Sequence, residues 1–420
     1  MNLYENAQNT EKLILVGVCL TGRNGSVRKN EAEVEESLDE LADLIETAGG
    51  ETVAKIYQAR ESIHPGTYIG KGKIDEIREL IEHTEATGVV CDDELSPAQL
   101  SNLEHELDIK VMDRTLIILD IFAGRAVTRE GKIQVELAQL RYRATRLVGL
   151  RNSLSRLGGG IGTRGPGEKK LEMDRRLIRE RISILKNEVE SMKKQRDVAR
   201  KNREKAPVTV VAIVGYTNAG KSTFLNKLTG AGVLEEDKLF ATLDPTTRNY
   251  RLESGQEILL TDTVGFIRKL PHHLIDAFRS TLEEAKYADI ILHVVDSSNS
   301  QMEKHIKTVY ETLDNLEVGD KPVITVFNKQ DKSTEPAEML RDERADYVIK
   351  ASVKTGMGID EILGAVEEII RNKKRYMTKL YSYEEAGKIQ QIRKYGELLT
   401  EEYREDGIYV EAYVPVELSE

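Results

Sequence analysis

The sequence predicts an α/β protein with two parallel-sheet domains, a long antiparallel helical hairpin between them, and a small α+β domain at the C-terminus. Three observations support this fold class. Strand-like apolar runs alternate with helical patterns in the first 128 residues, residues 129–205 are basic and lack strand patterns, and a glycine-rich loop follows a buried strand near residue 215. Such alternation is typical of βαβ units. We therefore expect domains at 1–128, 129–205, 206–373 and 374–420.

The composition predicts a globular chain without a membrane span. The 420 residues are 40% hydrophobic and 32% charged, with a net charge of −11. The apolar runs have the length of strands, and the N-terminus lacks the basic-then-apolar pattern of a secretory leader. Cys19 and Cys91 lie in apolar runs without metal-ligand spacing, so we expect reduced, buried thiols. A cytoplasmic monomer is expected, and peripheral association with the membrane stays open.

Within the first domain, the expected strands are 13–20, 53–57, 88–91 and 110–112, and the expected helices are about 31–48, 73–83, 97–107 and 115–123. Two polar motifs have competing interpretations. The run 70–73 (GKGK) lacks the spacing of a second phosphate loop and predicts a turn before a helix. The run 92–94 (DDE) predicts an acidic strand end before a helix capped near Ser96, rather than a metal site.

Residues 129–205 are the basic part of an acidic chain. They hold 22 Lys and Arg against 10 Asp and Glu. This asymmetry indicates a nucleic-acid-binding module, with a solvated helix surface as the alternative. Narrow apolar stripes predict two helices, about 129–151 and 168–205. Because arginines on a glycine-rich loop can approach phosphates and stack on unpaired bases, we expect RNA contacts through Arg151, Arg156 and Arg164.

A phosphate loop lies between a buried strand and a helix: Gly215, Tyr216, Thr217, Asn218, Ala219, Gly220, Lys221 and Ser222, with Thr223 next. In this pattern the backbone N–H groups face the phosphates, the lysine contacts the β and γ oxygens, and the serine hydroxyl binds Mg²⁺. About 40 residues later come Asp262, Thr263, Val264 and Gly265. We expect Asp262 to hold Mg²⁺ through water and the Gly265 N–H to meet the γ-phosphate.

Two further motifs select the base. Asn328, Lys329, Gln330 and Asp331 follow a strand, and Ser352, Val353 and Lys354 follow the next one. An aspartate can accept hydrogen bonds from the N1–H and 2-amino groups of guanine, whereas adenine offers neither donor there, so its polar groups would stay unpaired. The Ser352–Lys354 backbone is positioned to reach the guanine O6. The four motifs, in this order and spacing, predict a GTP-binding and GTP-hydrolysing domain.

The loop before the second motif predicts the nucleotide switch: Phe240, Ala241, Thr242, Leu243, Asp244, Pro245, Thr246 and Thr247. A threonine here can complete the Mg²⁺ shell while the γ-phosphate is present, and all three threonines qualify by chemistry. Some GTPases orient water with a glutamine where this chain has Phe266, so we expect slow hydrolysis until a partner completes the site. Asn218 is a candidate ligand for K⁺, a question left open.

From residue 376 the tail predicts a helix near 383–394 and a hairpin of 398–403 and 408–414.

With these motifs in hand, the chain resembles the HflX family, in the Obg–HflX class of translation-associated P-loop GTPases, from about residue 12 to the C-terminus. The segments that carry the resemblance are 64–73 (HPGTYIGKGK), 92–99 (DDELSPAQ), 102–104 (NLE), 113–115 (DRT), 158–168 (GGGIGTRGPGE) and 240–244 (FATLD). One departure from the family pattern is Lys169 and Lys170, where the family usually has Thr-Gln.

The resemblance implies the same domain order, binding to the 50S subunit and 70S ribosome through 23S rRNA, splitting or rescue of stalled ribosomes, and hydrolysis stimulated by ribosomes. It assigns the Mg²⁺ role to Thr242, so that Lys221, Thr242 and Gly265 are the expected catalytic residues. Ribosome assembly or antibiotic protection is the alternative within this chemistry. Other classes are an RNA-modifying domain gated by GTP, for which no catalytic pair or cofactor loop is present, and a scaffold that binds GTP without meaningful hydrolysis.

Overall fold

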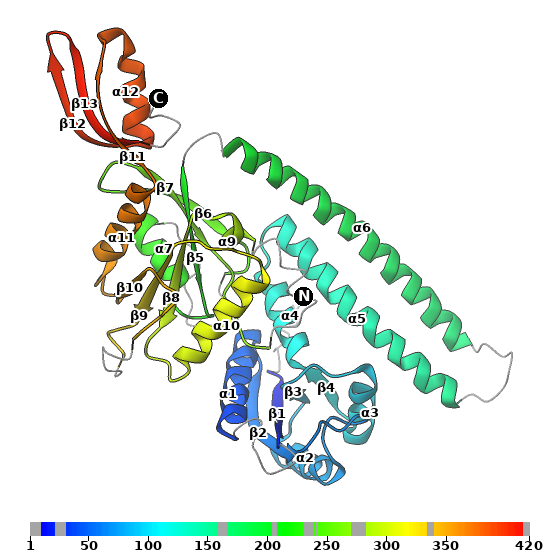
Figure 1. Ribbon diagram of the computed structural model, residues 1–420. Coiled ribbons are helices and arrows are strands. Elements are labelled where there is room, and N and C mark those ends of the chain that lie inside the picture. The colour runs from blue at the N-terminus through cyan, green and yellow to red at the C-terminus, as the bar shows by residue number, and fades with distance from the viewer. Residues whose placement is uncertain are drawn as a thin grey trace, which may run out of the picture. The chain divides into compact units, whose positions relative to one another are not determined.

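The computed structural model describes residues 10–21, 31–157, 166–203, 208–230, 239–240, 242–269, 283–333 and 340–414, with the backbone alone for 147–157, 166–171, 197 and 199–203. The chain forms two compact units, Met1–Glu190 with Lys269–Ala277 and Ser191–Arg268 with Phe278–Glu420. Two parallel-sheet parts, a helical hairpin and a small C-terminal α+β part are visible (Figure 1), so the predicted fold class is confirmed. None of the described helices has both the length and the hydropathy needed to cross a membrane.

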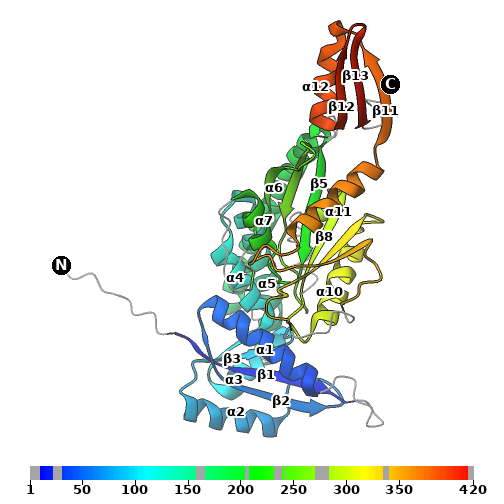
Figure 2. The same ribbon diagram turned by 90° about the vertical axis from the view of Figure 1, so that its left-hand side faces the viewer.

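A four-stranded parallel sheet forms the N-terminal part. Its strands, in spatial order, are β2 (Glu51–Arg60), β1 (Lys12–Leu20), β3 (Gly88–Cys91) and β4 (Lys110–Asp113). Its helices are α1 (Glu31–Ala48), α2 (Lys71–Thr84), α3 (Pro97–Leu107) and α4 (Arg114–Arg125). Ile14 and Val16 of β1 share a core with α2 and α3, while Gly17 faces Val34 of α1 on the other side (Figure 2). A strand covered on both faces is a continuous apolar run, which made β1 predictable.

The acidic strand end after β3 is an ion-pair network. Asp92 is buried and accepts hydrogen bonds from Ser37 Oγ (2.7 Å) and Arg114 Nη1 (2.9 Å), and it also pairs with Lys269. Burial alone would raise the pKa of Asp92, but Lys269 and Arg114 hold it below its usual value. The described residues contain no group of three or more His, Cys, Asp or Glu side chains that could hold a metal.

The two helix starts predicted in this part are observed. Ser96 caps α3: its hydroxyl accepts from the Gln99 backbone N–H (3.3 Å), and the side-chain Oε1 of Gln99 accepts from the Ser96 N–H (2.9 Å). α2 begins at Lys71 directly after an extended Gly70, as expected for a turn before a helix rather than a phosphate loop.

The hairpin helices are α5 (Arg129–Leu157) and α6 (Pro166–Arg203), which run side by side (Figures 1 and 2). The first was expected to end at Arg151, and that boundary is wrong. Arg151 and Arg156 belong to α5, while Arg164 lies outside the described residues. The guanidinium of Arg181 in α6 makes two hydrogen bonds to Glu136 of α5 (2.7 and 2.9 Å). The helix continues because its last residues contain no helix breaker before Gly158.

The middle of α5 is fixed to the N-terminal sheet through Asp113 at the end of β4. Tyr142 donates its hydroxyl to Asp113 Oδ1 (2.7 Å), and Arg146 donates to Asp113 Oδ2 (2.5 Å). Both carboxylate oxygens also accept backbone N–H groups, from Leu116 and Leu95 respectively. Because Asp113 is fully buried, these partners satisfy a group that would otherwise cost stability.

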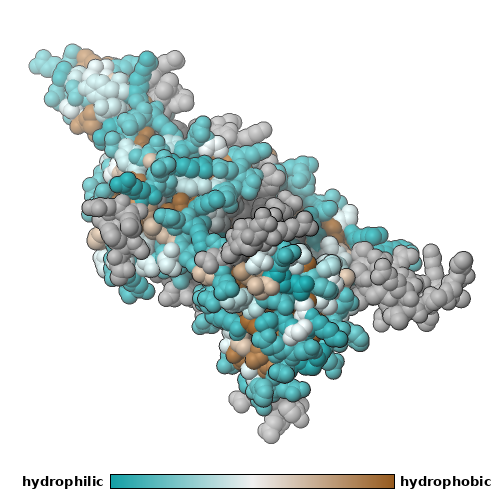
Figure 3. All heavy atoms as spheres, turned by 60° about the horizontal axis from the view of Figure 1, so that its bottom comes forward, coloured by the Kyte–Doolittle hydropathy of each residue, from teal (hydrophilic) through white to brown (hydrophobic). Residues whose placement is uncertain are grey.

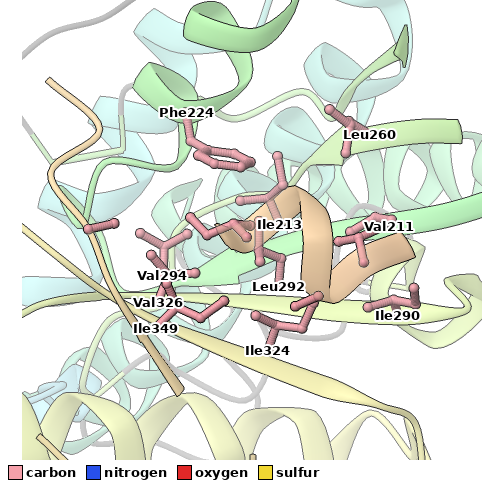
Figure 4. Packing of buried hydrophobic residues seen from close by; sticks show 14 of the residues in the cluster. Val211, Ile213, Phe224, Leu260, Ile290, Leu292, Val294, Ile324, Val326 and Ile349 are labelled. Atoms are coloured by element: carbon pink, nitrogen blue, oxygen red, sulfur yellow. The ribbon is translucent and has the colours of Figure 1, made fainter. Parts of the chain in front are cut away.

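A six-stranded sheet carries the phosphate loop. In spatial order its strands are β10 (Tyr347–Lys350), β9 (Val323–Asn328), β8 (Ile290–Asp296), β5 (Thr209–Gly215), β7 (Glu257–Asp262) and β6 (Thr246–Arg251). Its helices are α7 (Lys221–Thr229), α9 (Glu284–Tyr287), α10 (Met302–Asn315) and α11 (Ile359–Asn372). Figure 4 shows Ile213 and Leu292 of the inner strands packed in one cluster with Phe224 of α7. The polar edge strand β6, antiparallel to β7, was not predicted.

The C-terminal part is a three-stranded antiparallel sheet with one helix. The strands, in spatial order, are β11 (Arg375–Tyr381), β13 (Gly407–Val414) and β12 (Glu397–Arg404), and α12 (Ala386–Tyr395) follows the short 3-10 turn Tyr383–Glu385. Ile389 and Ile392 of α12 pack on Val410 and Ala412. The predicted helix and hairpin are present, whereas β11 was missed because most of its residues are exposed and its Tyr, Met and Leu side chains form neither a continuous apolar run nor a strict alternation. The face of the molecule in Figure 3 is predominantly hydrophilic.

Candidate active site

The phosphate loop occupies the turn between β5 and α7, at the carboxyl end of the central strand. Gly220 has φ +101°, and a Cβ there would lie 2.3 Å from Asn328 Nδ2, so glycine is required on two counts. Asn218 also adopts a left-handed backbone (φ +59°). The N–H groups at the start of α7 therefore face the position where the sequence predicts phosphate.

Lys221 is the first residue of α7, directly after the turn of this loop. Its ammonium donates to the Tyr216 carbonyl (2.7 Å), which holds the side chain across the loop. Burial lowers the pKa of Lys221 to about 8, although the nearby Asp262 carboxylate acts in the opposite direction. A buried cation with so few acidic neighbours is well matched to a polyanionic ligand, because phosphate oxygens would restore its favoured charged form.

Three oxygen-bearing side chains meet beside the loop. The hydroxyls of Ser222 and Thr242 are 2.7 Å apart, and each lies within hydrogen-bond distance of Asp262 Oδ2 (2.8 and 3.0 Å). Asp262 Oδ1 is buried without a hydrogen-bond partner, and burial raises the pKa of this carboxyl despite the opposing effect of Lys221. Hard oxygen donors with one unsatisfied carboxylate oxygen fit Mg²⁺. Their role as ligands stays a prediction.

Of the three candidate threonines, Thr242 is the one at this cluster. Thr246 and Thr247 belong to β6, and the Thr247 hydroxyl is instead 3.0 Å from the Thr261 hydroxyl of β7. Within the predicted switch loop, Phe240 and Leu243 are buried, Asp244 is half-buried, and Ala241 lies outside the described residues. The structure thus distinguishes three threonines that residue chemistry alone left open, and it places Thr242, the residue that the family resemblance implied, beside Ser222 and Asp262.

The segment after Asp262 continues along the phosphate loop. The Thr263 N–H and hydroxyl donate to the Ile213 carbonyl (3.3 and 2.8 Å). The Phe266 N–H donates to the Gly215 carbonyl (3.1 Å), and the Phe266 carbonyl accepts from the Thr217 N–H (2.9 Å). The Phe266 side chain is buried. An apolar ring has no group that can orient a water molecule, so the chain's own residue at this position cannot act as the glutamine does in other GTPases.

The two base-selecting motifs are tied to each other and to the phosphate loop. Asn328 Nδ2 donates to the Ala219 carbonyl (2.8 Å), and its Oδ1 accepts from the Val353 N–H (3.0 Å). The Ser352 hydroxyl donates to Asp331 Oδ1 (2.6 Å) and lowers the pKa of this carboxyl. The Asp331 carboxylate is thereby kept ionised and oriented, as an acceptor for two guanine donors requires. Lys354 is exposed beside them.

Sequence reasoning missed a turn that supports this pocket. Asp296, at the end of β8, pairs with Lys329 (2.7 Å), a residue with φ +62°. The next residue, Ser297, donates its N–H and hydroxyl to the Asn328 carbonyl (3.0 and 2.6 Å) and accepts from the Gln330 amide (2.8 Å). The sequence did offer one indication of this turn. Asp296 and Ser297 stand at the carboxyl end of β8, which pairs in parallel with β9, and the carboxyl ends of neighbouring parallel strands meet at one edge of a sheet.

Family models match most of the chain. A family described as "GTP-binding GTPase N-terminal" matches residues 35–123, one described as "GTP-binding GTPase Middle Region" matches 125–203, and one described as "50S ribosome-binding GTPase" matches 210–329. These ranges correspond to the N-terminal part without β1, the hairpin and the larger part of the six-stranded sheet.

Curated relatives cover the chain at high identity. A protein named GTPase HflX from Lacrimispora saccharolytica is 65% identical over 99% of this chain and 96% of that relative. A protein of the same name from Escherichia coli K12 is 46% identical over 79% of each chain. A solved GTP-binding protein from Sulfolobus solfataricus in complex with GDP is 25% identical, covers 86% of this chain and 98% of its own, and has a TM-score of 0.45.

Proposed function

The chain belongs to the HflX family of GTPases and hydrolyses GTP, and from this premise we propose that it binds the 50S ribosomal subunit and splits or rescues stalled ribosomes, with hydrolysis stimulated by the ribosome. One observation carries the proposal: the same chain holds the four guanine-nucleotide motifs and a hairpin segment, 129–205, that has 22 basic and 10 acidic residues and whose described residues form two helices. The description of the matched family, a ribosome-binding GTPase, supports the same partner.

Within the site, each of these residues has a separate role in binding or hydrolysing GTP. Lys221 stabilises negative charge on the β and γ oxygens, and Gly265 orients the γ-phosphate through its N–H. Ser222 and Thr242 would hold Mg²⁺ directly and Asp262 through water; when bound, this ion supplies charge neutralisation between the β- and γ-phosphates. Asp331 reads guanine.

Hydrolysis by the isolated chain is slow in this proposal. Phe266 offers nothing to orient water, and its backbone is hydrogen-bonded to the phosphate loop. Ribosome binding would supply or reposition the missing group. K⁺ bound near Asn218 is a second candidate for charge stabilisation, and replacing KCl by NaCl in a hydrolysis assay tests it, since loss of activity in NaCl is expected only if K⁺ is bound.

The hairpin provides the RNA contact. A helix of the length of α6 extends on the order of 50–60 Å at about 1.5 Å per residue, which is long enough to enter a deep RNA cavity. Arg151, Arg156 and Arg164 bind rRNA phosphates or bases at or near its tip. Replacing all three by Glu should weaken 50S binding and flatten its salt dependence. Unchanged binding would refute this role.

Co-sedimentation with 30S, 50S and 70S particles tests the proposed function. With a non-hydrolysable GTP analogue, we expect the chain on 50S subunits and a loss of 70S particles; with GDP, we expect neither. Multiple turnover that rises on addition of 50S subunits excludes a passive GTP-binding scaffold. Selective binding to immature or drug-bound particles would favour the assembly or protection alternative, and absence of ribosome binding in every nucleotide state would sink the proposal.

A further inference from the structure

Thr217, the third residue of the phosphate loop, carries a hydroxyl that the described part of the chain does not engage. The residue is buried, and its Oγ1 has no hydrogen-bond partner among the described residues. Its backbone N–H, in contrast, donates to the Phe266 carbonyl (2.9 Å). Buried hydroxyls are almost always hydrogen-bonded, because an unpaired polar atom inside a protein costs stability. An unpaired hydroxyl within a ligand-binding loop therefore indicates a contact that is made in the presence of the ligand.

The side chain of Thr217 lies beside the two residues that are expected to contact the γ-phosphate. A Cβ built on Gly265, whose N–H is the predicted γ-phosphate contact, would lie 2.8 Å from Thr217 Cγ2 and 3.0 Å from Lys221 Nζ. Lysine at this position of the loop contacts the β and γ oxygens. Oγ1 branches from the same carbon as Cγ2. Thr217, Gly265 and Lys221 thus form one corner of the site, at the end of the nucleotide that is cleaved.

Hydrolysis requires a hydrogen-bond acceptor as well as donors at this corner. The oxygens of an ionised phosphate only accept, and backbone N–H groups and Lys221 can serve them. The attacking water must also donate a hydrogen bond if it is to be oriented. Some GTPases orient the water with a glutamine where this chain has Phe266. A hydroxyl can accept as well as donate, so Thr217 has the chemistry that Phe266 lacks.

Other hydroxyls of the site already have partners. Those of Ser222 and Thr242 lie 2.7 Å apart, and that of Thr263 donates to a carbonyl of β5 (2.8 Å). Of these three hydroxyls and that of Thr217, the Thr217 hydroxyl alone has no partner in the described part of the structure. It is therefore the one that can bind a water molecule without first giving up a contact within the protein.

We propose that Thr217 is a catalytic residue whose hydroxyl accepts a hydrogen bond from the attacking water and orients it toward the γ-phosphorus. The water oxygen bonds to the γ-phosphorus, and the bond from phosphorus to the β–γ bridging oxygen breaks with its electron pair on GDP. The proton that the water loses passes to a γ-phosphate oxygen, so the products are GDP and dihydrogen phosphate. Thr217 itself is unchanged. One hydroxyl lacks the second polar group of a glutamine amide, in keeping with slow hydrolysis by the isolated chain.

The test compares Thr217→Val with Thr217→Ser in the full chain without ribosomes. Valine keeps the shape of the side chain and removes the hydroxyl, whereas serine keeps the hydroxyl and removes the methyl group. Single-turnover hydrolysis of GTP labelled at the γ-phosphate gives the rate. The valine variant should be about 10- to 100-fold slower, less than the effect of removing a preorganised oxyanion donor, and the serine variant should stay within about 3-fold of the unmodified chain. Affinities for GDP and a non-hydrolysable GTP analogue should be unchanged, because the hydroxyl contacts the water.

The matched control is Thr312→Val in α10, which also replaces a threonine hydroxyl by a methyl group. That hydroxyl donates to the Thr308 carbonyl of the same helix (2.8 Å), so rate and affinities should not change. The proposal is overturned if the Thr217→Val chain hydrolyses GTP at the unmodified rate. It is also overturned if the affinity for either nucleotide falls in step with the rate, because the hydroxyl then serves binding, or if serine is as slow as valine, because the methyl group is then responsible. Since no ribosomes are present, failure here leaves the proposed partner untouched.

Discussion

Two parallel sheets in this molecule end in polar side chains, and the way those side chains are satisfied differs. After β3 and β4 of the N-terminal sheet, Asp92 and Asp113 have partners on both carboxylate oxygens. After β5 and β7 of the six-stranded sheet, Asp262 Oδ1 and Thr217 Oγ1 are buried without a hydrogen-bond partner. Since buried polar groups are normally paired, the first set is built to hold the fold and the second to receive a ligand.

The sharpest test of this contrast is Arg114→Met, which should destabilise the fold without affecting nucleotide binding. Arg114 is buried and pairs with Asp92 and Glu40. The substitution removes the guanidinium from two largely buried carboxylates at once, while Asp92 keeps Lys269 and Ser37, and we expect the free energy of unfolding to fall by about 3–5 kcal/mol. Urea denaturation followed by circular dichroism measures this, and GDP affinity should be unchanged.

Arg78→Met is the matched control for that substitution. Arg78 pairs with Asp75 on the exposed surface of α2, where an ion pair contributes about 1 kcal/mol or less. The contrast would fail if Arg114→Met lowered GDP affinity as strongly as it lowered stability, because the N-terminal network would then serve the nucleotide site.

In the six-stranded sheet we expect the opposite result: a substitution should lower nucleotide affinity and leave stability nearly unchanged. Asp331→Asn tests this. Asparagine cannot accept from both guanine donors, so GDP affinity should fall about 100-fold or more. Xanthosine diphosphate, which has a carbonyl in place of the 2-amino group, should bind better than before. Stability without nucleotide should barely change, since Asp331 is exposed and its partner is the Ser352 hydroxyl. Asp314→Asn, at an exposed pair with Arg344, is a suitable control; unchanged GDP affinity in the Asp331 variant would contradict the base assignment.

A smaller effect is expected from Asp296→Asn. The substitution keeps an acceptor for the Ser298 N–H but removes the charge that pairs with Lys329. Affinity for GDP and GTP should decrease together, about 3- to 10-fold, the effect of a charge-assisted hydrogen bond in a half-buried site. Preference for guanine over xanthine should not change, because Asp331 is intact. A changed base preference in a competition assay would show that Asp296 itself takes part in reading the base.

What could be predicted from the sequence was local in the chain, and what could not depends on contacts between distant residues. The four nucleotide motifs were readable because each is a short contiguous run after a buried strand, where apolar β-branched residues mark the strand clearly. The edge strands β6 and β11 were not recognised because β6 is polar and β11 is mostly exposed, and neither contains a continuous apolar run. Choosing Thr242 among three threonines from residue chemistry, and recognising that Asp296 and Ser297 meet the turn at Asn328–Gln330, needs tertiary placement. Local spacing carries no information about which distant side chains meet.

The least disruptive test changes only pH. Burial lowers the pKa of Lys221 to about 8, so in the nucleotide-free protein this ammonium loses its proton as pH rises through 8. Phosphate oxygens favour the charged form, so GDP binding above pH 8 should take up a proton and weaken several-fold by pH 9. Calorimetry in buffers of different ionisation enthalpy measures the uptake. Lys221→Arg, whose guanidinium stays protonated, should show none.

The same lowered pKa predicts the opposite pH dependence for the stability of the nucleotide-free protein: stability should rise with pH, whereas GDP affinity should fall. The folded pKa of Lys221 lies below its ordinary value of 10.5, so the unfolded chain binds more protons between about pH 8 and 10.5. This group therefore penalises the folded state at neutral pH, and the penalty disappears as pH rises through that window. Stability of the empty protein and affinity for GDP should thus respond in opposite directions to the titration of one side chain. A parallel decline of both, absent from Lys221→Met, would mean that Lys221 is stabilised by the protein's own groups and is not held ready for phosphate.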